Sequence, residues 1–245
     1  MNETHNTSPN TLCEYDEHEI RHIKLGNQTI TQVLKLPQQM IDYMWQCIDI
    51  AKKNPICHKN YLAGRISHSY KLKDSHNLVV RNLLDLFYNS DNNPEMFEFI
   101  NNEINRTYKK MGVIKKGMTL APHLDVMWVN FQKKGEFQPL HTHDSTFSFV
   151  IWMDIPYDCK DENKLHFARS NSPGSTCGNF SFAFPCEVSR SIVEHFIELS
   201  PKMNGYCCFF PSDLSHQVYP FYTSDKDRIS ISGNISYYPM KLNSL

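Results

Sequence analysis

The sequence predicts an α+β protein that is mainly β, with helices of the first half supporting the sheets of the second half. Three observations lead to this fold class. Apolar residues recur at helical spacing in three segments before Gly112, and after Gly117 the pattern changes to the alternation typical of strands. The turn signals KKGE, SPGS, KMNG and TSDK divide that alternation into short runs. Eight strands of this kind are typical of a β-sandwich or barrel.

Length and composition predict one domain. The 245 residues are 40% hydrophobic and 12% aromatic, which indicates a folded protein with a substantial core. Within residues 1–245 we expect a loose terminus over 1–18, a helical support region over 19–116 and a β core over 117–240. The eight cysteines form no C-x-x-C pair, which predicts reduced thiols rather than a structural zinc site.

Charge and hydropathy restrict the partners. No export signal or run of about 20 apolar residues is recognisable, so we expect a cytoplasmic protein with no membrane partner. The net charge is −1 and no basic stripe is visible, which argues against general nucleic-acid binding.

In the first half, the alternation between residues 20 and 36 around the turn signal Gly26-Asn27 predicts a β-hairpin. Three helices follow, with Pro37, Asp74 or Ser75, and Gly112 as end signals. Their ranges are 37–53, 79–87 and 94–111. The polar segment 56–74 between the first two is expected to form a long loop, and long loops often border a binding site.

In the second half, period-two alternation predicts eight strands. Their ranges are 123–132, 146–155, 164–169, 179–184, 191–199, 205–210, 216–221 and 228–238.

Two histidines near the start of a strand indicate a metal site. His141 and His143 are two positions apart, and residues i and i+2 of a strand point to the same face. Two imidazoles on one face can bind one cation if a third group joins them, and His216 is the best candidate. Three ligands that leave further positions open suit a non-haem iron oxygenase, but imidazole also suits zinc, which stays an alternative.

Arg228 opens a strand on which Arg228, Ser230 and Ser232 share one face. An interior lined by arginine and serine is unfavourable unless an anion compensates the charge. A guanidinium with a hydroxyl beside it is well suited to a carboxylate. The alternatives are an internal ion pair with Asp or Glu and a solvent-exposed sheet face.

This order of residues, H-x-H, then H, then R-x-S, resembles that of the Fe(II)/2-oxoglutarate-dependent oxygenases. The stretches PLHTHDSTFSFVIWMDIP and FPSDLSHQVYPFYTSDKDRISISGNI look like the small 2-oxoglutarate oxygenases of marine T4-like phages and some bacteria. The resemblance covers about residues 120–240. It implies a double-stranded β-helix, a jelly-roll or cupin-like fold, with the N-terminal helices buttressing one sheet.

The resemblance also implies roles for individual residues. Iron would be bound by His141, His143 and His216. Most of the family has a carboxylate where this chain has His143, so Asp144 is an alternative ligand, although neighbours on a strand point apart. The distal carboxylate of 2-oxoglutarate would be bound by three further residues: Arg228, Ser230 as its hydroxyl partner, and Asn130 on the preceding strand.

The implied activity is that of a dioxygenase with Fe(II) as cofactor and 2-oxoglutarate and O₂ as co-substrates. Such an enzyme hydroxylates its primary substrate and releases succinate and CO₂, with no catalytic side chain beyond the metal ligands. A protein side chain, such as proline, is the expected substrate by analogy, and the compartment would be the host cytoplasm if the protein is viral. Two alternatives stay open: a cupin-like metalloenzyme that does not use 2-oxoglutarate, and a non-catalytic β-sandwich binding module.

Overall fold

The computed structural model describes residues 21–25, 29–74, 77–87, 94–110, 112, 118–168, 176–186 and 190–241. The predicted loose terminus 1–18 and the turn at Gly26-Asn27 lie outside the described residues. Among the residues described, no helix is both long enough and apolar enough to cross a membrane.

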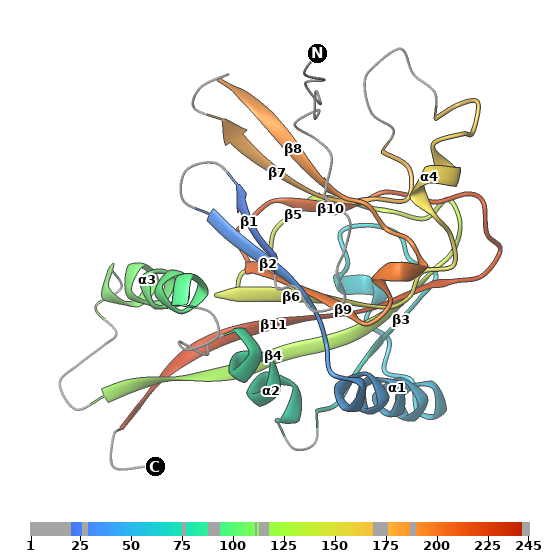
Figure 1. Ribbon diagram of the computed structural model, residues 1–245. Helices are drawn as coiled ribbons and strands as arrows, with labels where there is room; N and C mark the ends of the chain where they lie inside the picture. The colour runs from blue at the N-terminus through green and yellow to red at the C-terminus, as the bar shows by residue number, and fades with distance from the viewer. Residues whose placement is uncertain are drawn as a thin grey trace, which may run out of the picture.

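Two antiparallel sheets form the centre of the fold (Figure 1). The larger sheet has seven strands in the order β1 (Arg21–Leu25), β2 (Thr29–Lys35), β9 (Tyr206–Pro211), β6 (Phe147–Asp154), β11 (Arg228–Lys241), β4 (Met118–Gln132) and β3 (His68–Lys71). The smaller sheet has four strands in the order β5 (Gln138–His141), β10 (His216–Val218), β7 (Phe180–Cys186) and β8 (Ser191–Ile197).

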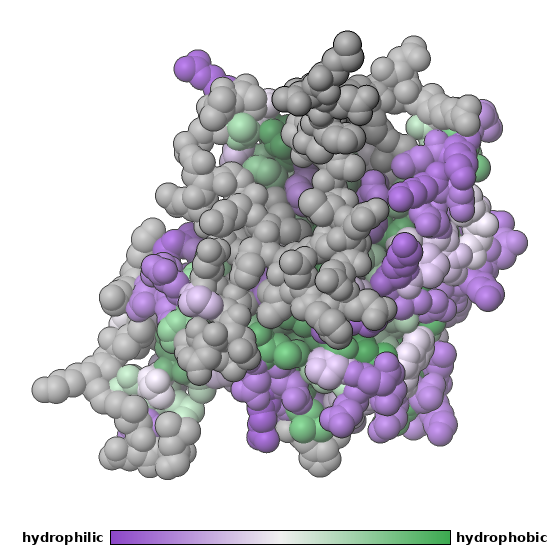
Figure 2. All heavy atoms as spheres, in the orientation of Figure 1, coloured by the Kyte–Doolittle hydropathy of each residue, from purple (hydrophilic) through white to green (hydrophobic). Residues whose placement is uncertain are grey.

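The helices α1 (Gln38–Lys53) and α2 (Leu78–Phe87) lie on the side of the large sheet away from the small one (Figure 1), and α3 (Pro94–Lys110) lies beside the end of β6 and packs into the same hydrophobic cluster as these two helices. Each helix presents an apolar stripe to the sheet, and one hydrophobic cluster joins helix residues such as Met44 and Leu83 to sheet residues such as Ile231. The opposite face of α1 is mainly polar, and Figure 2 shows mostly hydrophilic residues at that lower right part of the surface.

The alternation of β11 separates this core from the space between the sheets. Ile231 and Ile235 are buried in the cluster shared with the helices, and Ile229 packs against it. The alternate residues Arg228 and Ser230 line the space between the two sheets. A second hydrophobic cluster, with Trp152, Phe182 and Phe210, closes the rest of that space. Strand periodicity therefore places one face in the core and leaves the other for a site.

Most sequence-based elements are confirmed. The helices 37–53, 79–87 and 94–111 correspond to α1, α2 and α3, and the hairpin of 20–36 corresponds to β1 and β2. Seven of the eight strands predicted in the second half are present. The strand predicted at 216–221 is shorter, His216–Val218, and the strand predicted at 228–238 is longer and extends to Lys241. The mainly β class, with antiparallel sheets supported by helices, is therefore confirmed.

The predicted strand 164–169 is wrong. Asp158 accepts a hydrogen bond from the Lys160 amide and caps the short helix α4 (Cys159–Glu162), which is followed by turns up to residue 168. The amides of Lys164 and Leu165 donate to carbonyls three residues back, so they are satisfied locally and need no strand partner.

The segment 56–74 is also more ordered than a long loop. It contains a short 3₁₀ helix (Lys59–Tyr61) and β3, which adds an edge strand to the large sheet. Gly64 brings the segment against the start of β5, where its amide donates a 2.8 Å hydrogen bond to Oε1 of Gln138. This close approach makes the segment a wall of the space between the sheets.

We expect Gly64→Ala to lower the free energy of unfolding by about 1–3 kcal/mol, the usual range for overpacking. A Cβ at this position would lie 2.1 Å from the carbonyl oxygen of Phe137 and 2.9 Å from Cα of Gln138. Both are backbone atoms, which cannot rotate away. Urea denaturation of the two proteins measures the difference, and equal midpoints would show that the segment does not pack closely on β5.

Candidate metal centre

A cavity of about 530 Å³ lies between the two sheets. Its lining comes from β4, β6 and β11, from the ends of β5, β7 and β10, from Phe210 of β9, from the segment 58–63 and from Lys71 of β3. Tyr61 lines the cavity and its side chain is 74% exposed, so the cavity reaches the surface beside this residue. The expectation that 56–74 borders a site agrees with this lining.

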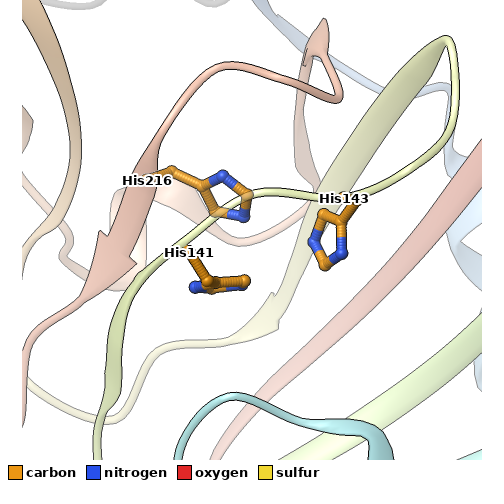
Figure 3. Close-up of side chains that lie close together, drawn as sticks. All are labelled: His141, His143 and His216. Carbon is orange, nitrogen blue, oxygen red and sulfur yellow. The ribbon is translucent and has the colours of Figure 1, made fainter.

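Three imidazoles meet in this cavity (Figure 3). His141 ends β5 and lies opposite His216 of β10 in the register of the small sheet, whereas His143 lies in the loop two positions beyond the strand. One ring nitrogen from each histidine lies within 4.8 Å of the other two. The ring centroids of His141 and His216 are 4.2 Å apart, and His143 is 5.1 Å from both.

Backbone carbonyls orient two of the rings. Nδ1 of His141 lies 2.7 Å from the carbonyl oxygen of Pro139, and Nδ1 of His216 lies 2.9 Å from that of Leu214. As a donor in these bonds, Nδ1 carries the proton and leaves the lone pair of Nε2 available to a metal. His143 is fixed through its backbone, because its amide donates a 2.8 Å hydrogen bond to the carbonyl of Ser212.

Burial keeps the three imidazoles neutral. Desolvation lowers the pKa of His141, and it lowers the pKa of His216, which is 4% exposed, well below the usual histidine value, with His141 adding to the effect. Desolvation, then His141, lowers the pKa of His143 to about 4, although Asp144 opposes this shift. A metal binds the neutral form, so these residues fit a divalent ion with imidazole affinity, such as iron or zinc.

Asp144 does not belong to the cluster. Its side chain is exposed, and the three histidines form the group without it. His143 therefore lies where a ligand would have to be, and Asp144 does not. The assignment of His141, His143 and His216 as ligands stays a prediction that this geometry supports.

Arg228 lies in the same cavity with its side chain buried to 2% exposure. Its guanidinium donates to the hydroxyl of Tyr157, to Oε1 of Gln132 at 2.5 Å, and at longer range to the carbonyls of Gly178 and Tyr219. All these partners are neutral, because burial raises the pKa of the Tyr157 phenol to about 12 and keeps it protonated.

No Asp or Glu pairs with Arg228 in the described part of the chain, and the side chain is not exposed, so neither alternative interpretation of this arginine fits. None of its direct partners carries a charge, and burying a cation is costly; the buried carboxylate of Glu162, beside Tyr157, accepts hydrogen bonds from the amides of Tyr222 and Thr223 instead. A carboxylate ligand in the cavity would supply the missing charge and a bidentate partner.

Ser230 and Asn130 also line the cavity, side by side on β11 and β4. Oδ1 of Asn130 is buried and has no hydrogen-bond partner among the described residues. Trp128 and Trp152 line the cavity as well, and the ring of Trp128 lies 5.8 Å from that of His143, edge to face.

Sequence reasoning missed two groups of site residues. Gln132 and Tyr157 hold Arg228, and no spacing signal identifies them, because their partner is 71 or more positions away in the chain. The second group lies in the segment 56–74, where His58, Tyr61 and Lys71 line the cavity. Their only sequence signal was the irregular polar pattern of that segment.

Comparisons with known proteins agree with this chemistry. Residues 126–234, which include the three histidines and Arg228, match a family model described as "Putative 2OG-Fe(II) oxygenase". The search of curated proteins found no match.

Solved structures with a similar trace include a prolyl-4-hydroxylase from Pseudomonas putida (13% identity, TM-score 0.46, covering 85% of this chain and 92% of that one). A 2OG-Fe(II) oxygenase family oxidoreductase from Burkholderia pseudomallei has 13% identity and a TM-score of 0.41, covering 83% and 84%. A Trichoplax adhaerens prolyl hydroxylase, solved in complex with a hypoxia inducible factor peptide fragment, has 11% identity and a TM-score of 0.42, covering 85% and 83%. TM-scores in this range do not by themselves establish a common fold.

We expect His216→Ala to abolish metal binding, because His216 of β10 contributes one of the three imidazoles, and the two that would remain come from the end of β5 and the loop after it. Equilibrium dialysis with Fe(II) or Mn(II), followed by metal analysis, measures the loss. His123→Ala is the matched control, since His123 is exposed and does not line the cavity. Full metal content in His216→Ala would refute the ligand assignment.

We expect the metal-free protein to lose stability as the pH falls from about 6.5 towards 4. Burial, then Lys71, lowers the pKa of His58 to about 4, and the pKa of His143 is also about 4, whereas an unfolded histidine has about 6.5. Below that value the unfolded chain takes up these protons first, so the free energy of unfolding decreases; above it, this contribution is fully present. Urea denaturation across the window measures the slope. His58→Gln should reduce the slope, and a flat profile in wild type would contradict the prediction.

Proposed function

We propose, from the match of residues 126–234 to the 2OG-Fe(II) oxygenase family model, that this chain is a 2-oxoglutarate-dependent dioxygenase whose Fe(II) is held by His141, His143 and His216. Arg228, with Ser230 and Asn130 beside it, receives the distal carboxylate of 2-oxoglutarate. The overall reaction balances as one 2-oxoglutarate, one O₂ and one substrate C–H bond giving succinate, CO₂ and a C–OH group.

The observation that carries the proposal is the buried guanidinium of Arg228, which has only neutral partners and shares one cavity with the three neutral imidazoles. A ligand that fits both the guanidinium and a metal in this cavity has a carboxylate at one end, for Arg228, and chelating oxygens at the other end, for the metal. 2-Oxoglutarate has both, and the family uses it.

We further propose that the two sheets form a double-stranded β-helix. In support, all their strands pair antiparallel, the site lies between the sheets, and α1 and α2 lie on the outer side of the larger one. The single-domain organisation stays part of this proposal.

In this mechanism the bound iron supplies the redox chemistry that couples decarboxylation of 2-oxoglutarate to oxidation of the substrate. The protein orients the co-substrate and limits its contact with solvent. Tyr157 and Gln132 hold the guanidinium of Arg228 in one orientation, so the co-substrate carboxylate has a fixed anchor. The two sheets exclude bulk water from the site. No side chain beyond the metal ligands acts as a catalytic acid or base.

A protein side chain stays the proposed class of primary substrate. In support, the cavity opens beside Tyr61, where an extended segment of another chain can approach.

The all-imidazole ligand set is the one observation that favours a cupin-like metalloenzyme without 2-oxoglutarate. Thermal stability with Fe(II) or Mn(II), with and without 2-oxoglutarate, separates the two functions. Co-substrate at about 100 times its dissociation constant should add about 2.7 kcal/mol, and succinate should form in the presence of O₂. A metal response without a 2-oxoglutarate response would favour the alternative.

We expect Arg228→Met to weaken 2-oxoglutarate binding by about 100-fold or more while metal content stays near that of wild type. The variant removes a bidentate partner of the carboxylate without touching the imidazoles. Calorimetric titration of the Mn(II)-loaded protein measures the affinity, and Arg106→Met, on the exposed side of α3, is the control. Unchanged affinity for 2-oxoglutarate in Arg228→Met would remove Arg228 from the site.

A further inference from the structure

The cavity is a strongly cationic enclosure. Two of its lining side chains, Arg228 and Lys71, carry a full positive charge, and no Asp or Glu is among the lining residues that the structure describes. A bound divalent metal would add to this charge. The two negative charges of 2-oxoglutarate can balance the two charges of the metal or the two charged side chains, but not both. The site with metal and co-substrate bound therefore retains an excess of positive charge.

Lys71 points to the cavity for a structural reason. It ends β3 and lies opposite Trp128 of β4, just as Ser69 lies opposite Asn130. Residues paired across strands share a face, so Lys71 and Ser69 belong to the face of Trp128 and Asn130, which line the cavity. Tyr70, between them, packs on the helical side against Phe131.

A chain of ring contacts connects Lys71 to the metal centre. The ring of Trp128 lies 5.8 Å from that of His143 and 4.7 Å from that of His58. His58 stacks on Tyr61 at 5.3 Å, and Nζ of Lys71 lies 5.2 Å from the Tyr61 ring centroid. Lys71 therefore lies by the mouth of the cavity that holds the histidines.

Lys71 and Arg228 occupy different ends of the site. In the strand register, Arg228 of β11 lies opposite Gln132 of β4, and Lys71 of β3, the neighbour at the other edge of β4, lies opposite Trp128. Gln132 and Trp128 are four residues apart on β4. Four residues of strand span about 13 Å. One five-carbon dianion bound at Arg228 and at the metal does not also neutralise Lys71.

The surroundings of Lys71 are basic as well. Residues 56–74 contain Lys59, Arg65, Lys71 and Lys73 and a single acidic residue, Asp74, whose carboxylate accepts hydrogen bonds from Tyr43 and from the start of α2. No carboxylate forms an ion pair with Lys71 within the described residues; its Nζ lies over the Tyr61 ring, and its charge helps to lower the pKa of His58. The wall that the first half of the chain adds to the cavity thus attracts anions.

From these observations we infer that the primary substrate carries an anionic group, a carboxylate or a phosphate, which Lys71 binds at the cavity mouth beside the Tyr61 ring. The inference rests on the proposed function only in calling this ligand the primary substrate. It makes Lys71 a specificity-determining residue that acts from outside the family-matched segment 126–234.

The test uses the full chain loaded with Mn(II), with and without saturating 2-oxoglutarate, at constant ionic strength. The probes are inorganic phosphate, acetate and N-acetyl-glutamate amide, with N-acetyl-glutamine amide as the uncharged counterpart. In wild type at least one anionic probe should bind in the presence of 2-oxoglutarate, and the uncharged probe should not. Which anionic probe binds most tightly identifies the group as phosphate, simple carboxylate or peptide side-chain carboxylate.

Lys71→Met should weaken that binding at least tenfold, Lys71→Arg should retain most of it, and both should keep the wild-type affinity for Mn(II) and 2-oxoglutarate. Lys73→Met is the matched control, because it removes the same charge from an exposed neighbour that does not line the cavity. Equal losses in Lys71→Met and Lys73→Met, or none in either, would overturn the inference. If the proposed function is wrong, the wild-type protein does not bind 2-oxoglutarate. The titrations of the anionic probes without 2-oxoglutarate then still test whether Lys71 binds an anion.

Discussion

The buried charge of Arg228 is the constraint on which the arrangement of the site depends. A guanidinium at 2% exposure must have its donors satisfied, and this fold satisfies them with a phenol, an amide side chain and two backbone carbonyls drawn from four separate parts of the chain. These partners fix the position of the cation but leave its charge uncompensated. In the proposed function, the carboxylate of 2-oxoglutarate supplies the charge that these neutral partners do not.

The same strand that carries Arg228 also connects the site to the core. Its isoleucines pack against the helices while its polar residues face the cavity, so a slip of one residue would exchange the two sets. This explains why period-two alternation in the sequence predicts the cavity face correctly. The meeting of His141 and His216 was predicted from residue type and spacing alone, because the strand that His141 closes, β5, was not among the predicted strands. That the two strands are neighbours is a property of tertiary pairing.

What escaped prediction depends on contacts between distant segments. β3 is only four residues long and is stabilised by pairing with β4, and β5 is fixed by the approach of Gly64. Neither carries enough periodicity of its own to be recognised. The opposite error occurred at 164–169, where the apolar pattern of Leu165 and Phe167 resembled a strand but the backbone amides found partners within a turn. Local pattern identifies long elements reliably, whereas short ones depend on the partner strand or turn that satisfies their hydrogen bonds.

The proposed ligand set, with an imidazole where most of the family has a carboxylate, has a consequence for the charge of the whole cavity. Three neutral histidines leave the full charge of a divalent metal uncompensated, and no lining side chain in the described residues is acidic. In the proposed function, this charge is balanced by bound anions, the 2-oxoglutarate carboxylate at Arg228 and an anionic substrate group at Lys71. Because attraction between charges is stronger in a partly desolvated cavity than in water, each anion that binds lowers the remaining positive charge and weakens the attraction for the next. With the proposed roles of Arg228 and Lys71, this charge distribution favours binding of the dianionic co-substrate before the anionic substrate.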